Sequence, residues 1–120
     1  ASTEEMAQIE RQKAADSAKD DRDNFSRQCL NSAQYQLYET AQIIAYNRKN
    51  IETAKSEIKH DDEVAAESGV SDLSIRRKAG EAIVNARKNM QLAFQTYTKL
   101  GGRERTPDAV TIGDNPCLNP

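Results

Sequence analysis

The chain has 120 residues, of which 37% are hydrophobic, 30% charged and 5% aromatic, with no Trp, so it has room for one domain with a thin, aliphatic core. Its 17 basic and 19 acidic residues are interspersed and give a net charge of -2, which argues against a dedicated binder of nucleic acid or anionic membranes. No stretch reaches the roughly 18 apolar residues that a membrane-spanning helix needs, so we expect no membrane insertion.

The first 106 residues contain no proline, and only two glycines precede the Gly101-Gly102 pair. This predicts a first helix over about residues 3–66, a turn at 67–71 that includes Gly69, a second helix over about 72–100, and an irregular tail over 101–120. Residues 3–22 carry few apolar side chains, so their course is open. We favour an unbroken first helix; the alternative is a bend near Asp23-Asn24 that folds the first segment back as a third helix.

Branched aliphatic residues recur every seven positions along the first helix, at Leu30, Leu37, Ile44, Ile51 and Ile58. The second helix carries alanines at the same interval: Ala79, Ala86 and Ala93. If the chain folds back at residues 68–69, facing residues have numbers that sum to about 137, and large side chains meet small ones in nearly every layer. The predicted fold is therefore an all-α, elongated antiparallel helical hairpin of coiled-coil type.

The same register makes two predictions about charged residues. It pairs Asp61 with Arg76 at the mouth of the hairpin. It also brings Arg48 near Arg87 on a flank, where we expect both side chains to extend into water.

The two cysteines, Cys29 and Cys117, predict a disulfide that ties the tail to the first helix. Such a bond requires an oxidising compartment, so we expect a periplasmic or extracellular protein. The chain begins Ala-Ser-Thr, without Met, as a mature product does after a secretory signal is removed; a cloning remnant would look the same.

Residues that could carry catalysis are sparse. His60 is the only histidine, and the run His60-Asp61-Asp62-Glu63 is interpreted as a solvated helix face rather than a cation site. The run Arg76-Arg77-Lys78 is interpreted in the same way rather than as a phosphate site. There is no Gly-rich phosphate loop, nucleophile elbow or Cys-x-x-Cys, so we expect no enzyme activity, catalytic residue, metal, cofactor or small-molecule substrate.

Apolar and aromatic side chains remain after the hairpin seam is assigned, and these are typical of protein interfaces. The candidate partner-binding residues are Tyr35, Tyr38, Ile43, Tyr46 and Leu92. The competing interpretation is that the N-terminal segment, or the tail through Val110, Ile112 and Leu118, covers them. We expect an adaptor, chaperone-like or inhibitory module that binds another protein. The alternative is a structural subunit that binds copies of itself in a bundle, filament or secretion apparatus.

Overall fold

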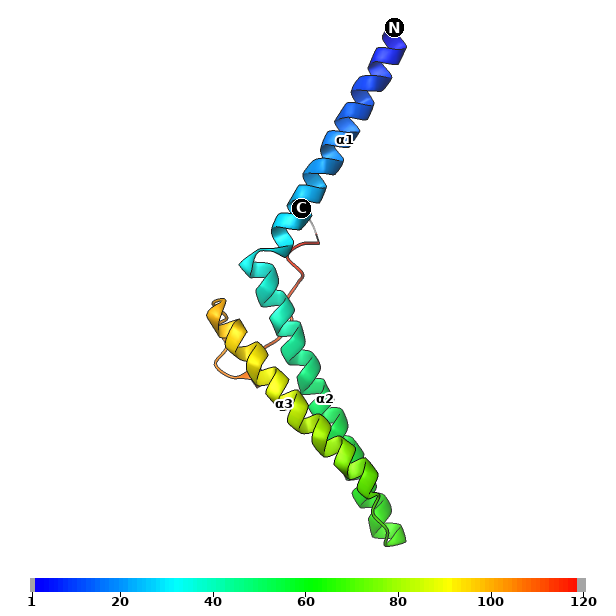
Figure 1. The fold of residues 1–120 in the computed structure, drawn as a ribbon, viewed down its shortest axis with the longest axis vertical. Coiled ribbons are helices and arrows are strands. Elements are labelled where there is room, and N and C mark those ends of the chain that lie inside the picture. The colour runs from blue at the N-terminus through cyan, green and yellow to red at the C-terminus, as the bar shows by residue number, and fades with distance from the viewer. Residues whose placement is uncertain (1, 119–120) are drawn as a thin grey trace. The chain divides into compact units, whose positions relative to one another are not determined.

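A computed structural model describes residues 2–118, in which every regular element is a helix. The elements are α1 (Thr3–Leu30), α2 (Ala33–Ser68), α3 (Leu73–Lys99) and a short 3-10 helix, η1 (Pro107–Ala109) (Figure 1). The chain divides into two compact units, and α2 begins in the first and continues into the second. The first unit comprises Ala1–Gln36 with Asn115–Pro120, and the second comprises Leu37–Asp114. The predicted all-α class is confirmed.

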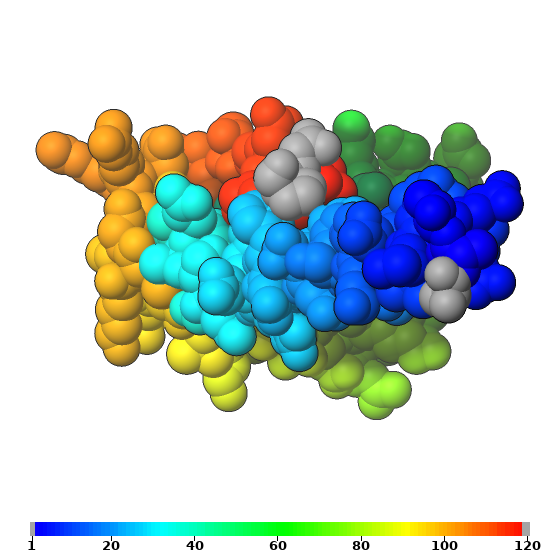
Figure 2. All heavy atoms as spheres, turned by 90° about the horizontal axis from the view of Figure 1, so that it is seen from above, coloured from blue at the N-terminus to red at the C-terminus, as the bar shows by residue number. Residues whose placement is uncertain are grey.

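The first unit holds α1 and the end of the tail. The Ser2 hydroxyl caps α1 by accepting a hydrogen bond from the Glu5 N–H at 3.1 Å. No residue of α1 is buried; the helix is drawn in blue in Figure 2. The predicted disulfide is present: it joins Cys29 to Cys117, which are 88 positions apart in sequence, with their Cα atoms 5.7 Å apart.

The single helix expected over residues 3–66 is wrong, because the structure has two helices separated at Asn31 and Ser32. The Ser32 hydroxyl donates to the Cys29 carbonyl at 2.6 Å and lies 3.2 Å from the Tyr35 N–H, from which it accepts. A serine that satisfies backbone groups on both sides replaces the helical bonds of its own turn, so one helix ends and another begins. The alternative bend at Asp23-Asn24 does not occur, since both residues lie within α1.

The second unit is an antiparallel hairpin of α2 and α3, which lie side by side in Figure 1. Ile44 is fully buried in a cluster with Ala93, as the predicted pairing of large with small residues requires. Asp61 and Arg76 form the predicted ion pair, with Oδ2 and Nε 2.6 Å apart. The buried positions are Thr40, Ala41, Ile44, Asn47, Ile51, Ala54 and Asp61 of α2, and Ala79, Ala86 and Ala93 of α3. The predicted heptad positions Ile44, Ile51, Ala79, Ala86 and Ala93 are among them. Leu30 is not part of the seam, because it ends α1 and is 48% exposed.

The turn between the two helices is held by the Asp61 carboxylate. Its Oδ1 accepts from the Asp72 N–H at 2.9 Å, and its Oδ2 accepts from the Ser71 hydroxyl at 2.9 Å and from Arg76. Asp72 in turn caps α3 through its own side chain. Gly69 precedes this network with φ of 75°, a left-handed conformation that glycine adopts without strain.

Two side chains hold the tail on the hairpin: Val110 of the tail and Arg48 of α2. Val110 is fully buried against Ala41, Ile44 and Ala93. Arg48 Nη1 donates to three tail carbonyls, those of Pro107, Asp108 and Val110, at 3.1, 3.1 and 2.9 Å. The expectation that Arg48 extends into water is therefore wrong, because the tail supplies backbone acceptors that satisfy its charge locally.

Candidate functional site

The predicted partner-binding residues do not form one surface. Tyr46 is 67% exposed, Leu92 54% and Ile43 42%. Tyr38 is half-buried and its hydroxyl accepts from Gln42 Nε2 at 2.6 Å. It lies five residues before Ile43, which is about 140° around the helix, and so it projects from a different side of α2. Tyr35 is half-buried and belongs to the first unit.

The tail does not cover the three exposed residues in the way the competing interpretation requires. Val110 enters the hairpin seam beside Ile44 and Ala93 rather than covering an outer face. Ile112 and Leu118 are themselves exposed, at 52% and 71%. Ile43, Tyr46 and Leu92 therefore keep large apolar area open in this structure.

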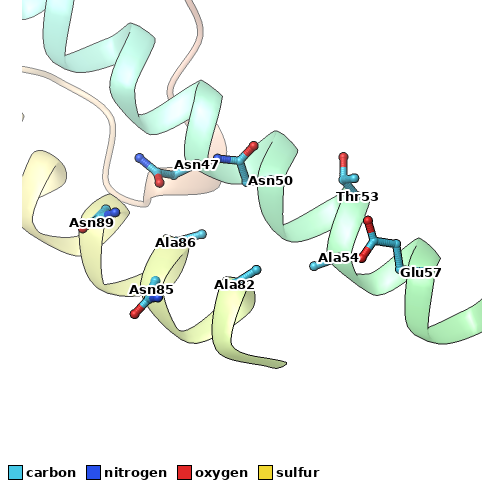
Figure 3. Close-up of a pocket in the computed structure, with 9 residues that line it drawn as sticks. All are labelled: Asn47, Asn50, Thr53, Ala54, Glu57, Ala82, Asn85, Ala86 and Asn89. Atoms are coloured by element: carbon cyan, nitrogen blue, oxygen red, sulfur yellow. The ribbon is translucent and has the colours of Figure 1, made fainter. Parts of the chain in front are cut away.

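A hollow of about 350 Å³ runs between α2 and α3 (Figure 3). Ala54 and Ala86 are buried beneath it, and the close-up shows carboxamide groups from both helices around it. Its lining is Asn47, Asn50, Thr53, Ala54 and Glu57 from α2 with Ala82, Asn85, Ala86 and Asn89 from α3. Short side chains at the seam let the two helices approach closely and leave this groove open along their line of contact.

The middle of this groove carries no charge, although 30% of the chain is charged. Glu57 is the one ionisable residue in its lining. Charged residues of the same helices stand elsewhere: Arg48 binds the tail, and Arg76 binds Asp61. An uncharged strip of this kind costs less to remove from water than the rest of the surface does.

Large apolar side chains stand at both ends of the groove, each one heptad beyond a lining residue. Ile43 and Tyr46 precede Asn50 and Thr53 by seven, and Leu92 follows Asn85 by seven. Toward the turn, Val64 follows Glu57 by seven and Ile75 precedes Ala82 by seven, and each is 42% exposed. We call this surface the groove face: the neutral groove with Ile43, Tyr46 and Leu92 at one end and Val64 and Ile75 at the other.

Sequence reasoning named Ile43, Tyr46 and Leu92 but missed Val64 and Ile75. The two missed residues also line a second hollow near the turn, with His60 and Asp72. The sequence contains the pattern that identifies them, because the seven-residue spacing that locates the seam also locates the residues beside it on each helix. The sequence does not show which flank of the hairpin the tail occupies.

The turn beside Val64 and Ile75 is organised around the Asp61 carboxylate. Hydrogen bonds from the Asp72 N–H and the Ser71 hydroxyl, together with the Arg76 guanidinium, hold the pKa of Asp61 below its ordinary value. The Asp61 carboxylate therefore stays charged while it holds the turn together. Among residues 2–118, no three or more His, Cys, Asp or Glu side chains gather in a way that could hold a metal ion.

None of the helices in the described part of the chain has the length and apolar character needed to cross a bilayer. No protein-family model, curated protein or solved structure matches the chain.

Proposed function

We propose that this chain is a non-enzymatic protein-interaction module of a secreted or periplasmic system, and that it binds protein through the groove face. The observation that carries the proposal is the neutral groove flanked by exposed Ile43, Tyr46 and Leu92. The Cys29–Cys117 disulfide supports the compartment, because such bonds persist where the medium is oxidising.

The energetic reason is that two helices bury too little by themselves. The two largest fully buried side chains of the described residues are Ile44 and Val110, so much apolar area stays in contact with water. Complete burial of a large aliphatic or aromatic side chain is worth about 1.5–3 kcal/mol, so each half-exposed residue of the groove face still offers about 1 kcal/mol to a partner. Interface centres are depleted of charge and enriched in tyrosine, which fits the groove and Tyr46.

A photo-reactive benzoyl-phenylalanine in place of Tyr46 tests the proposal in the cells that produce the protein. We expect irradiation to give a discrete covalent protein adduct, and we expect Ile43→Ser with Leu92→Ser to reduce its yield at unchanged helicity. The matched control is Val84→Ser, which removes an exposed aliphatic side chain of α3 that does not line the groove. Absence of an adduct, or an equal yield in all variants, would refute protein binding by this face.

A further inference from the structure

The residues of the groove face on α2 are spaced symmetrically about the centre of that face. Along α2, Ile43 and Val64 are equally far from the point between Thr53 and Ala54. Asn50 and Glu57 are equally far from the same point. A two-fold rotation about that point therefore exchanges an aliphatic residue with an aliphatic residue and an amide with a carboxylate.

We propose that the groove face binds the same face of a second copy of this chain, with the two hairpins antiparallel and their four helices forming a bundle. This inference rests on the proposed function and names its partner. In this arrangement Ile43 packs on Val64 of the second copy, and the Asn50 amide donates to the Glu57 carboxylate of the second copy. Each contact occurs twice because the interface is isologous.

The same rotation gives complementary contacts along α3. In the hairpin register, which places Ile44 beside Ala93 and Asp61 beside Arg76, the level that matches the centre of α2 falls between Ile83 and Val84, so Ala82 meets Asn85 of the second copy. A small side chain thus faces a larger one, as it does within the hairpin seam. Carboxamides suit a two-fold contact because each carries both a donor and an acceptor, so no like charges are opposed.

The area available is sufficient for a specific dimer. From Ile43 to Val64 the chain advances 21 residues, which is about 32 Å at 1.5 Å per residue. Two helices side by side are about 20 Å wide, so each copy offers roughly 640 Å². The total of roughly 1,300 Å² lies toward the lower end of the range for specific interfaces, about 1,200–2,000 Å², and predicts a dimer that forms reversibly with concentration.

The N-terminal helix is a poorer occupant than a second hairpin. Over residues 3–24 its large apolar side chains are Met6 and Ile9 alone. They stand less than one turn apart, so they could fill one end of a groove that is about 32 Å long. A second groove face brings apolar residues to both ends at once.

Paired charge variants test this arrangement on the purified protein. The double variants Ala82→Glu/Asn85→Glu and Ala82→Lys/Asn85→Lys alter two exposed positions, so the hairpin itself should remain folded. Sedimentation equilibrium should find a concentration-dependent dimer for the unaltered chain and at least about tenfold weaker association for either variant alone. Mixing the Glu and Lys variants should restore association as a heterodimer, because opposite charges then meet at each contact.

The control is Val84→Glu with Gln95→Glu, which adds the same charge to α3 at exposed positions that do not line the groove and should leave association unchanged. A monomer at every concentration would overturn the second copy as partner. If both variants still form the dimer, the groove face is not the dimer interface. If the Glu and Lys variants do not associate when mixed, the proposed antiparallel register is wrong. If the purified chain is monomeric while Ile43→Ser with Leu92→Ser still removes the adduct at Tyr46, the proposed function stands and its partner is a different protein.

Discussion

Replacing Val110 with alanine measures how much the tail contributes to the hairpin. The Val110 side chain is fully buried against Ala41, Ile44 and Ala93, and the substitution deletes two buried carbon groups. At about 0.8 kcal/mol per buried methylene, the transfer loss is about 1.6 kcal/mol. A cavity that does not collapse raises the cost toward about 2.7 kcal/mol, the lower end of measured Leu→Ala changes. We therefore expect the free energy of unfolding to fall by about 1.6–2.7 kcal/mol.

Urea unfolding followed by circular dichroism at 222 nm, with the disulfide intact, measures this change. The matched control is Ile112→Ala, since Ile112 is an aliphatic residue of the same tail that is 52% exposed, and it should cost less than about 0.5 kcal/mol. The slope of the free energy with urea should be equal in both variants if the same surface is exposed on unfolding. Equal losses for the two variants, or no loss for Val110→Ala, would mean that the tail is not part of the folded hairpin.

Three further predictions concern the disulfide, the turn and a helical glycine. Reduction of Cys29–Cys117 should lower the melting temperature, since closing 88 residues is worth up to about 4.6 kcal/mol in the chain-entropy model; calorimetry that finds equal melting with and without reductant would contradict this. The lowered pKa of Asp61 stabilises the fold in full above its ordinary value of 3.8, and this contribution is lost as pH falls through the lowered pKa. Acid titrations should show that Asp61→Asn removes this part of the pH dependence while Glu63→Gln does not. Gly80→Ala should raise the free energy of unfolding by about 0.5–1 kcal/mol, because Gly80 lies inside α3 with no atom near an added Cβ; a loss of stability would mean that this site is packed.

The hairpin register followed from the sequence because it rests on a short repeat. Residues seven apart share one side of a helix whatever the remainder of the chain does, so the heptad positions together with the turn predicted at residues 67–71 were enough to pair Ile44 with Ala93. Asp61 and Arg76 fell in the same register and form an ion pair in the structure. With two cysteines in the chain, an intramolecular disulfide had one possible pairing.

Other features depended on contacts that no repeat describes. The break at Ser32 is made by one hydroxyl that bonds backbone groups on either side of it, and serine occurs in the chain at many positions where no helix ends. The groove face was only partly found: Ile43, Tyr46 and Leu92 were named because they lie off the hairpin seam, and Val64 and Ile75 were missed. Both flanks of the hairpin carry apolar residues beside the seam, and the sequence does not say which flank the tail occupies.

The tail settles that question through tertiary contacts alone. Val110 and Arg48 are 62 positions apart, and their contact forms only after α2 and α3 have paired and created the seam that Val110 enters. Local periodicity determined the helices and how they pair, because side chains at fixed spacing share a face. The surface left open for binding was decided by long-range packing, because it depends on where an irregular segment finds both an apolar cavity and a donor for its carbonyl groups.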